Sequence, residues 1–349
     1  MNTESTTFLE GWRFEGMTEG TLEDCCLILA TYRRPNEIRE LLESVNNMRR
    51  RPAEVVVIDG SPDDDTRKAI SGWAGKTKVS FDLIYAKSPK GLTRQRNAGI
   101  DLSSRRYVFF LDDDCIPQGD YFEEILRVFV DDRAADIGAV SGLVINEMLQ
   151  PLSLRWRLRL ALRLAPQIQP GVYHHSGTSV PYNLISPFVG VRPIDTLSGC
   201  TMTFRREVLE RERFSEFFDG YAQGEDLEIS LRVRRRWSIL WCGAARVVHQ
   251  HALGGRPGSF AKGVMEVRNR HFIWKRHSPA AGSSDKWRFW LDVLFLIGVD
   301  VASFCYRPSR TYHMAHAGGL ISGAIGSIFS PPRFEEPAPR KQYQLCVAS

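Results

Sequence analysis

Apolar segments that alternate with helical segments constrain the fold of this chain more than any other feature. Residues 25–29 and 53–58 are short, apolar and bounded by turn-forming residues, as buried parallel strands are. Between them, the segment 34–50 contains a proline near its start and repeats its apolar residues at helical spacing. Further helices and strands are predicted in alternation at 66–73, 81–87, 91–103 and 106–112. The sequence therefore predicts an α/β sheet with helices on its faces.

The composition is that of a globular protein. The 349 residues are 43% hydrophobic and 25% charged, and a net charge of +5 does not indicate a nucleic-acid partner. Seven cysteines without a C-x-x-C pair are typical of small buried side chains in a reducing compartment rather than of a disulfide framework. The N-terminus carries acidic residues and lacks the basic start and apolar run of a signal peptide, so we expect a cytoplasmic protein.

Polar residues follow the predicted strands at the points where ligands bind in such sheets. Thr31, Tyr32 and Arg33 follow the first strand, Asp59 ends the second, and the acidic triplet 112–114 ends the strand at 106–112. The chain has no G-x-G-x-x-G after its first strand and no G-x-x-x-x-G-K-[ST] motif. These absences argue against a dinucleotide-dependent dehydrogenase and a P-loop kinase.

The triplet 112–114 places three negative charges at the end of a buried strand. Their mutual repulsion is relieved by a hard divalent cation, and Mg²⁺ or Mn²⁺ is commonly held by one or two carboxylates together with substrate phosphates. The alternative is a solvated turn before the helix that follows Asp120. A second triplet, 63–65, directly precedes a predicted helix, where acidic side chains are favoured by the helix dipole. We interpret only the first triplet as a metal and nucleotide site.

Two further segments carry candidate chemistry. The sequence GEDLEISLRVRR places Asp226 near the start of a predicted helix, where a carboxylate remains ionised and accepts a proton, although helix capping is an equally common role. The sequence VVHQH contains His249 and His251 in a strand-like alternation, and one of them is a candidate metal ligand. A buried histidine without a ligand is the alternative for either residue.

In their order, these motifs resemble the family 2 glycosyltransferases, which have the GT-A fold. The resemblance covers Cys25 to His277 and depends on eight segments: LILATYRRP, VVVIDGSPDD, GLTRQRNAGI, VFFLDDDCIP, SGCTMTFRREVL, GEDLEISLR, VVHQH and VRNR. It implies an inverting, metal-dependent enzyme with a GT-A type, Rossmann-like mixed sheet flanked by helices. It also implies a nucleotide-sugar donor, such as a UDP-, GDP- or dTDP-sugar.

The resemblance assigns the nucleotide to the ends of the first two strands. Thr31, Tyr32 and Arg33 resemble the loop that contacts the nucleotide. Asp59 resembles the acid that accepts a hydrogen bond from the imide group of the base. We therefore expect these four residues to lie together at one edge of the sheet.

The resemblance also assigns residues beside the ribose and the sugar. Arg96 and Asn97 match an Arg-Asn pair on the helix next to the donor. Asp112 resembles the ribose-side acid of the D-x-D motif, and Asp113 occupies its variable middle position, which shapes the turn. Cys115 follows the motif where the family often has an acid. This departure leaves the nucleotide-binding part of the motif complete.

The metal and the catalytic base come from the same resemblance. Asp114 matches the metal-binding acid of the D-x-D motif, and His249 resembles a third metal ligand of some members, with His251 as the alternative. The resemblance implies Mn²⁺ or Mg²⁺ as the cofactor. Asp226, the second residue of the Glu-Asp pair, resembles the base that deprotonates the acceptor hydroxyl. No Q-x-x-R-W motif of processive synthases occurs, so we do not expect a long polymer as product.

The remaining chain indicates how the domains are arranged and what the acceptor is. We expect an N-terminal extension at 1–24, a GT-A domain at 25–277 and a helical part at 278–330 that associates with a membrane, followed by a tail at 331–349. Within the GT-A domain, 25–120 is expected to bind the nucleotide sugar and 121–277 the acceptor. The helices at 278–330 are expected to be apolar or amphipathic. The apolar stretch 287–305 is interrupted by Asp292 and Asp300, which makes a membrane-spanning helix questionable.

A predicted helix at 154–164 carries a basic stripe. Arg155, Arg157, Arg159 and Arg163 lie on an otherwise apolar segment, which suits an anionic membrane surface or a lipid diphosphate. A packed helix with snorkelling arginines is the alternative. We expect a lipid-linked or cell-surface glycan as acceptor and a peripheral position on the cytoplasmic face of the membrane. The competing functions are a nucleotidyltransferase and a non-catalytic glycan- or membrane-binding module.

Overall fold

The computed structural model describes residues 6–16, 21–165, 169–180, 184–252, 254–279, 281–331 and 342–347. Parts of the expected extension at 1–24 and of the expected tail at 331–349 lie outside these residues. The chain divides into unit 1, which comprises Met1–Met148, Pro187–Gly255 and Pro337–Ser349, and unit 2, which comprises Leu149–Ser186 and Arg256–Glu336. Both units are therefore built from segments that are separated in the sequence.

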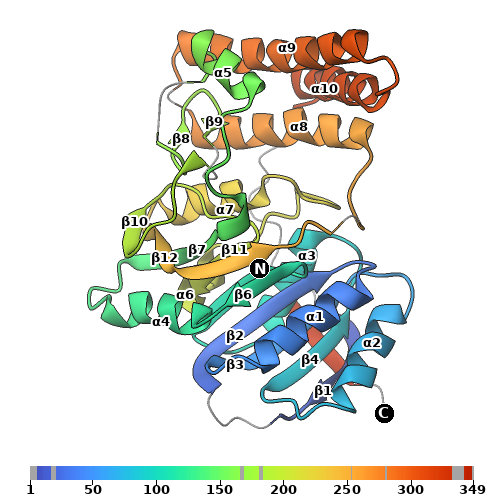
Figure 1. Ribbon diagram of the computed structural model, residues 1–349, viewed down its shortest axis with the longest axis vertical. Helices are drawn as coiled ribbons and strands as arrows, with labels where there is room; N and C mark the ends of the chain where they lie inside the picture. Colours follow the sequence, from blue (N-terminus) through green and yellow to red (C-terminus); the bar gives the residue numbers. More distant parts are fainter. Residues whose placement is uncertain are drawn as a thin grey trace. The chain divides into compact units, whose positions relative to one another are not determined.

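Unit 1 contains an eleven-stranded mixed sheet within the described ranges (Figure 1). Its strands are β1 (Thr6–Phe14), β2 (Thr21–Thr31), β3 (Arg51–Asp59), β4 (Asp82–Lys87), β5 (Tyr107–Asp112), β6 (Cys115–Gln118), β7 (Ile137–Val144), β10 (Val191–Pro193), β11 (Thr201–Arg205), β12 (Ser238–His249) and β13 (Gln342–Val347). Along the sheet their order is β10-β12-β7-β11-β5-β2-β3-β4-β1-β13, and β6 pairs with β12.

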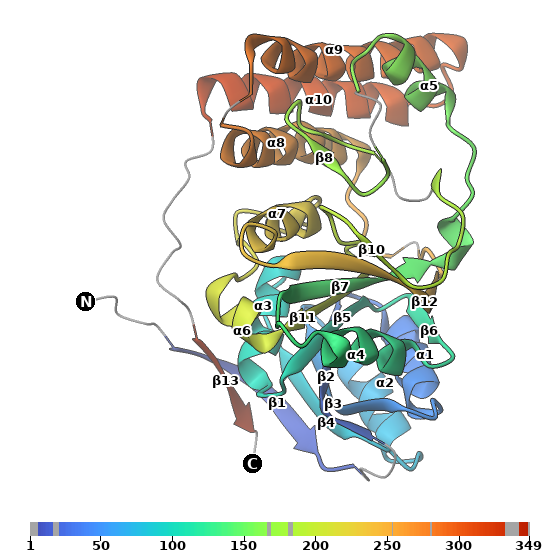
Figure 2. The same cartoon turned by 90° about the vertical axis from the view of Figure 1, so that its left-hand side faces the viewer.

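The centre of the sheet is parallel and its flanks are mixed. β2 pairs in parallel with β3 and β5, and β3 with β4. β11 lies antiparallel between β5 and β7, and β12 runs parallel to β7. At the other edge β1 is antiparallel to β4 and parallel to β13, which comes from the opposite end of the chain (Figure 2). The predicted α/β mixed sheet is confirmed.

Helices accompany the sheet of unit 1, and several of them, such as α1 and α4, bury an apolar face. They are α1 (Pro35–Asn46), α2 (Asp65–Ala74), α3 (Leu92–Leu102), α4 (Tyr121–Asp131), the 3₁₀ turn η1 (Ile145–Glu147), α6 (Arg206–Arg211) and α7 (Glu225–Val233). In α1, Pro35 occupies the first turn and the buried residues recur at helical spacing. On α3, a Cβ at Gly99 would lie 2.3 Å from Cγ2 of Ile28, so glycine allows this helix to pack closely on β2.

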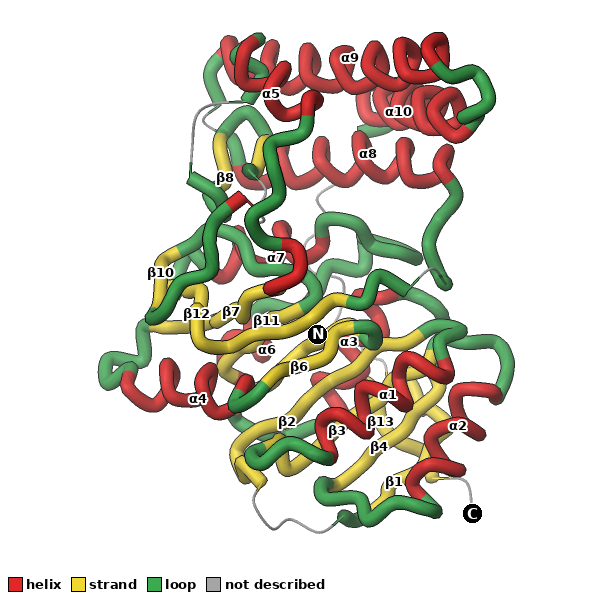
Figure 3. Tube along the Cα trace, viewed as in Figure 1, coloured by secondary structure: helices red, strands yellow, loops and turns green. Residues whose placement is uncertain are grey.

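The described part of unit 2 is mainly helical (Figure 3). Its elements are α5 (Leu154–Ala161), the short strands β8 (Tyr173–His174) and β9 (Thr178–Ser179), α8 (Ser259–His277), α9 (Ser283–Tyr306) and α10 (Tyr312–Phe329). The last three helices share an apolar core, in which the rings of Trp274 and Phe289 stack with centroids 4.6 Å apart. Helix α9 is long and apolar enough to cross a membrane by length and composition.

The helix predicted at 154–164 is shorter than expected. Helix α5 ends at Ala161, and Arg163 adopts a left-handed backbone conformation with φ of 54°, which a continuing helix excludes. The expected basic stripe is also divided by its contacts. Arg155 pairs with Glu266 at 3.1 Å, and buried Arg159 pairs with Asp292. Only Arg157 and Arg163 of the four arginines are largely exposed to solvent.

Candidate active site

The carboxyl ends of the central strands bring the first candidate residues to one edge of the sheet. In the parallel register, Thr31 of β2 is paired with Asp59 of β3, and Ala30 with Asp112 of β5. The strand β5 ends at Asp112, so Asp113 and Asp114 form the turn that leads into β6. The carboxylates therefore stand where ligands bind in open α/β sheets.

Asp59 is completely buried and held in one orientation. Its Oδ1 accepts a hydrogen bond from the backbone N–H of Ser61 at 2.8 Å, and its Oδ2 accepts one from the Tyr85 hydroxyl at 2.8 Å. Lys87 Nζ lies 3.4 Å from the same Oδ2. Burial and the bond to Asp59 raise the pKa of the Tyr85 hydroxyl far above its usual range, which keeps it a donor. Asp59 is thus fixed in orientation at the carboxyl end of β3.

The loop after β2 presents its next two side chains away from the core. Arg33 has a φ of 55°, and its backbone N–H donates to Ser61 Oγ at 2.7 Å. This strained conformation leaves the Arg33 side chain exposed. Tyr32 is half-buried, and the Lys90 ammonium lies 4.3 Å from its ring centroid. An aromatic ring and cations are therefore available to a flat, anionic ligand.

Asp113 is engaged with the protein scaffold on both of its oxygens. Thr31 Oγ1 donates to Asp113 Oδ2 at 2.7 Å, and the Arg34 guanidinium lies 2.6 Å from Asp113 Oδ1. Burial raises the pKa of Asp113 to about 7 despite these partners. Arg34 also donates to the carbonyl oxygens of Ala252 and Gly254, so it joins the acidic turn to the loop after β12.

Asp114 and His249, the metal ligands suggested by the sequence, lie in contact with each other. His249 Nε2 lies 3.3 Å from Asp114 Oδ1, while Asp114 Oδ2 accepts from the backbone N–H of Ala252 at 2.9 Å. His249 Nδ1 lies 2.7 Å from Glu147 Oε1, an arrangement that directs Nε2 toward Asp114. Carboxylate, imidazole and an orienting second carboxylate are a donor set that Mn²⁺ accepts.

The pKa values of this pair reflect their mutual contact. Burial by itself raises the pKa of Asp114, but the hydrogen bond and charge of His249, together with Arg34, outweigh it and hold the pKa below its ordinary value. Burial alone would lower the pKa of His249. The carboxylates of Asp114 and Glu147 outweigh this effect and raise the pKa of His249 to about 10. The two neighbouring carboxylates thus favour the protonated form of the His249 ring.

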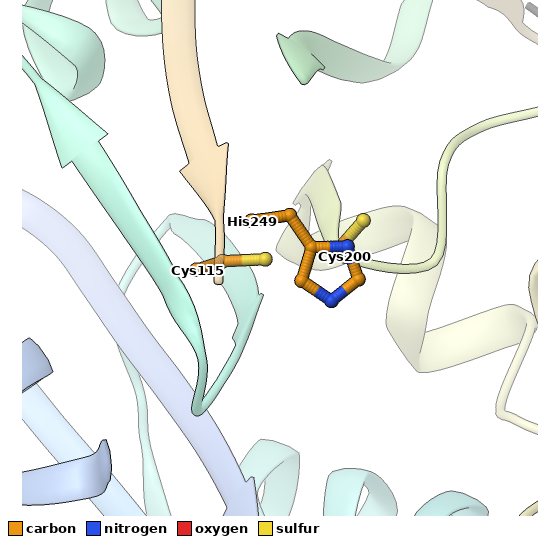
Figure 4. A group of neighbouring side chains, drawn as sticks. All are labelled: Cys115, Cys200 and His249. Atoms are coloured by element: carbon orange, nitrogen blue, oxygen red, sulfur yellow. The ribbon is translucent and has the colours of Figure 1, made fainter. Parts of the chain in front are cut away.

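His249 also has two thiols as neighbours. Figure 4 shows Cys115 and Cys200 beside its ring, and the candidate ligand atoms of the three residues lie within 4.8 Å of one another. The contact with Cys200 and burial raise the pKa of the Cys115 thiol well above its usual range. A protonated thiol is a poor ligand for a hard cation, so we interpret these cysteines as apolar packing. His251 instead lies with Nε2 3.3 Å from Glu147 and is half exposed.

Arg96 connects the two acidic parts of the site. From α3 its guanidinium contacts Asp112 Oδ1 at 3.1 Å and Glu225 Oε1 at 2.8 Å, and it donates to the carbonyl oxygen of Gly199 at 2.9 Å. Asn97 is placed differently. Its side chain donates to the carbonyl oxygen of Phe214 at 2.9 Å and accepts from the Phe214 N–H at 3.0 Å. Of the predicted Arg-Asn pair, only Arg96 therefore contacts the other candidate residues.

Asp226 lies in the first turn of α7, as the sequence predicts for the helix start. The preceding Gly224 has a φ of 93°, a conformation that favours glycine and turns the chain into the helix. Asp226 Oδ1 accepts from the backbone N–H of Leu227 at 2.8 Å, and Oδ2 from that of Gly199 at 3.0 Å. Burial raises the pKa of Asp226 against these hydrogen bonds. A carboxylate of this kind is suited to accept a proton.

Several residues of the site, including Gly199 of the segment SGCTMTFRREVL, were not singled out from the sequence. Arg34, Glu147 and Gly199 each hold a predicted residue through a contact that folding alone creates. Arg34 stands in the segment LILATYRRP, and Glu225 precedes the predicted base, so position in a motif was a usable signal for these two. Glu147 and Gly199 are separated from their partners by 102 and 27 residues.

A mixed α/β sheet with acids at its strand ends, an Asp-His pair and a carboxylate at a helix start defines a nucleotide-binding enzyme site. The chain belongs to glycosyl transferase family 2, because the model of that family matches residues 26–212. Family membership confirms the resemblance described above and sets the nucleotidyltransferase alternative aside. The chain accordingly has the GT-A fold.

Characterised proteins show the same likeness. The succinoglycan biosynthesis protein ExoM of Rhizobium meliloti is 30% identical over 132 residues, which are 37% of this chain and 40% of that protein. The GalNAc(5)-diNAcBac-PP-undecaprenol beta-1,3-glucosyltransferase of Campylobacter jejuni is 28% identical over 91 residues, 25% of this chain and 28% of that protein. The similarity thus spans less than half the length of these relatives.

A solved structure confirms the fold. The mannosyltransferase PcManGT from Pyrobaculum calidifontis, in complex with GDP-Man and Mn²⁺, superimposes with a TM-score of 0.53 at 17% identity. The superposition covers 88% of each chain. At this identity the likeness establishes the architecture, whereas substrates and site roles are argued separately below.

Proposed function

We propose that this protein transfers a sugar from a nucleotide-diphosphate sugar to a hydroxyl group of a cell-surface or lipid-linked glycan, with inversion at the anomeric carbon. One observation carries this proposal. Arg96 contacts Asp112 at the end of β5 and Glu225 at the start of α7, and Glu225 adjoins Asp226. The donor side and the base side of the reaction are thereby parts of one charge network.

Asp226 is proposed as the catalytic base. Its carboxylate accepts the proton of the acceptor hydroxyl while that oxygen attacks the anomeric carbon. The bond from this carbon to the diphosphate oxygen breaks with its electron pair, and the nucleoside diphosphate leaves. Attack opposite the leaving group inverts the configuration. The backbone N–H groups of Gly199 and Leu227 orient the carboxylate before the acceptor arrives.

Asp114 and His249 are proposed to hold Mn²⁺ or Mg²⁺. When bound, the ion offsets the negative charge that develops on the leaving diphosphate. The residues around the pair support this role, because Arg34 and the Ala252 N–H hold one oxygen of Asp114 while Glu147 orients His249.

The nucleotide is proposed to bind along the ends of β2 and β3. Asp59 accepts a hydrogen bond from the base, and Thr31, Tyr32 and Arg33 form the wall beside it. The buried position of Asp59 supports its role, because a carboxylate in a fixed orientation can accept a hydrogen bond from a particular base. The exposure of Arg33 supports its role, because an exposed guanidinium can contact the phosphates. UDP-, GDP- and dTDP-sugars are the donors to be compared.

A lipid-linked acceptor and a position on the cytoplasmic face of the membrane complete the proposal. The name of the Campylobacter relative, which acts on an undecaprenol-linked glycan, supports the acceptor class. The apolar helix α9 supports a membrane location.

Donor binding and turnover test the proposal together. UDP-, GDP- and dTDP-sugars are titrated with Mn²⁺ or Mg²⁺ into the wild type, Asp114→Ala and Asp226→Asn, with Asp131→Asn on the surface of α4 as the matched control. We expect one donor to bind in a metal-dependent manner. Asp114→Ala should lose that binding, and Asp226→Asn should retain it while turnover falls by about 10²–10⁴-fold.

The opposite result has a specific meaning. If no sugar nucleotide binds and neither substitution changes any measured property, the acidic turn is structural. The non-catalytic glycan- or membrane-binding module would then replace the enzyme. Turnover that survives in Asp226→Asn with donor binding intact would remove only the assignment of the base.

A further inference from the structure

Helix α9 buries acidic side chains and exposes apolar ones, which is the reverse of a helix at the surface of a water-soluble protein. Its acidic residues Asp292 and Asp300 are buried, whereas Trp287, Leu291 and Leu294 are among its exposed side chains. The exposed residues continue at helical spacing through Val301, so they form one apolar stripe along most of the helix. Water normally selects the opposite orientation.

The buried acids are neutralised inside unit 2. Asp292 Oδ1 accepts from Arg159 Nε of α5 at 2.6 Å, and its Oδ2 accepts from Arg270 of α8 at 2.8 Å. Asp300 lies 2.9 Å from His313 Nδ1 and 2.6 Å from His316 Nδ1, both on α10. The two buried acids of α9 thus bind neighbouring helices and do not contribute to its exposed face.

The neighbouring helices extend the apolar surface. Most exposed large apolar side chains in the described residues belong to unit 2, although it is the smaller unit. The exposed large apolar side chains at α5, α9 and α10, other than tyrosine, are called the outer apolar set. They are Leu154, Leu158 and Leu162 at α5, Trp287, Leu291, Leu294 and Val301 on α9, and Met314, Ile321, Ile325, Ile328 and Phe329 on α10. Such a quantity of exposed apolar surface indicates an interaction partner.

The charges around this set identify the partner. Helices α5 and α10 contain no acidic residue, and the acid in the first turn of α9, Asp285, pairs with Arg288 at 3.0 Å. Exposed cations accompany the set: Arg157 lies between Leu154 and Leu158 on α5, and Lys286 and Arg307 lie near the two ends of α9. Trp287 and Tyr306 place exposed aromatic rings near the two ends of α9. Apolar faces bordered by cations and aromatic rings are complementary to an anionic lipid bilayer.

We infer that unit 2 is a monotopic membrane-binding element: the outer apolar set enters the boundary between headgroups and acyl chains of an anionic bilayer, and α9 lies in the membrane plane without crossing it. This inference refines the location given in the proposed function. A crossing α9 would carry Asp292 and Asp300 into the hydrocarbon core. Arg159 and Arg270, which pair with Asp292 from the polar helices α5 and α8, would then have to enter the hydrocarbon core with it or release it.

Vesicle flotation of the full-length protein tests the surface. Vesicles of phosphatidylglycerol and phosphatidylcholine are compared with vesicles of phosphatidylcholine alone, at low and high salt. We expect binding to the anionic vesicles, weakened by salt. Leu291→Glu and Leu294→Glu each replace an exposed leucine of the proposed lipid contact by a charged side chain and should weaken binding about tenfold. Val130→Glu, at an exposed position of α4, is the matched control and should bind as the wild type does.

Two outcomes of flotation would overturn the inference. The surface is not a lipid contact if the protein does not float with either lipid mixture. It is an interface between two copies of the chain if the wild type forms a dimer that Leu291→Glu dissociates while flotation stays unchanged. Circular dichroism of each variant confirms that it is folded, so a lost signal reports the surface and not unfolding.

Cysteine labelling tests the orientation of α9. Cys305 and Cys346 are the exposed native cysteines among the described residues and are replaced by serine. Ser284→Cys at the start of α9 and Ser309→Cys after its end are then treated separately with a membrane-impermeant maleimide. In inverted membrane vesicles, whose cytoplasmic side faces outward, both should be labelled, and in intact spheroplasts neither. Labelling of the two cysteines from opposite sides would establish a crossing helix.

The membrane inference and the proposed function fail separately. Metal-dependent donor hydrolysis in detergent measures the site in unit 1 without any membrane. If hydrolysis persists while flotation is absent, only the membrane inference falls. If flotation is observed and no sugar nucleotide binds, the membrane contact stands and the enzymatic proposal falls.

Discussion

Glu147 Oε1 lies 2.7 Å from Nδ1 of His249, and this contact orients the imidazole toward Asp114. Second carboxylates of this kind typically account for about 10–100-fold in metal affinity. We expect Glu147→Gln to weaken Mn²⁺ binding by that factor in the presence of a nucleoside diphosphate, measured by titration calorimetry. Glu40→Gln, at an exposed position of α1, should leave the affinity unchanged. Equal affinities for wild type and Glu147→Gln would mean that Glu147 does not orient a ligand.

Arg34 compensates two buried carboxylates at once. Its guanidinium lies 2.6 Å from Asp113 and 3.3 Å from Asp114. We expect Arg34→Ala to lower the free energy of unfolding by about 3–5 kcal/mol, because both acids remain buried without it. Arg49→Ala removes an exposed pair with Glu123 and should cost at most about 1 kcal/mol. Urea unfolding of both variants, without metal, decides the matter. Equal losses would show that Arg34 is a surface contact.

Glu225 makes stability depend on pH. Burial, with the neighbouring charge of Asp226, raises the pKa of Glu225 from 4.5 to about 8 even though Arg96 lies 2.8 Å away. The folded chain therefore keeps a proton that the unfolded chain loses near pH 4.5. This contribution to the free energy of unfolding is complete below pH 4.5 and is lost as the pH rises toward 8.

The substitution Glu225→Gln preserves the shape of the protonated acid and removes its titration. We expect the melting temperature of this variant to fall less than that of the wild type as the pH is raised from 4.5 to about 8. Glu207→Gln, at an exposed position of α6, should follow the wild type. Asp113, whose pKa is raised to about 7, titrates in both proteins and cancels in the comparison. Parallel curves for Glu225→Gln and wild type would contradict the assignment.

Asp292 is the electrostatic centre of unit 2. It binds both Arg159 and Arg270, so Asp292→Asn leaves two largely buried cations without a carboxylate. We expect a loss of about 3–5 kcal/mol, seen as faster hydrogen exchange in peptides of α5, α8 and α9. Asp285→Asn breaks only the exposed pair with Arg288 and should cost about 0–1 kcal/mol. Unchanged exchange in Asp292→Asn would show that the pairs do not stabilise the unit.

The central part of the fold was predictable because its signals are local. The segments predicted at 25–29 and 53–58 lie within β2 and β3, and the helix predicted around 35–50 is α1. Buried strands and amphipathic helices of this kind bury their apolar residues at the spacing that defines them. Strands β1 and β13 escaped prediction, because their pairing joins residues near 6 and 342 and appears in no local pattern.

The sequence proposes residues for the candidate site but does not show their contacts. The family resemblance selected Asp112, Asp114, Asp226 and His249, and the structure places each of them beside another candidate or its direct partner. The partners that fix their orientation come from distant segments, and only the folded chain shows them. Asn97 illustrates the limit, since its motif position suggests the donor while its side chain is bound to the Phe214 backbone.

Because the chain returns to the sheet of unit 1 at β13, a variant that lacks the helices of unit 2 cannot be made by truncation. Residues 256–336 of unit 2 lie between β12 and β13, and both strands belong to the sheet of unit 1. A stop codon placed before α9 therefore deletes an edge strand of the catalytic unit along with the helices. Loss of activity in such a truncation would not report on the helices at all. An internal deletion of α9 and α10 that rejoins the chain to β13 is the informative design.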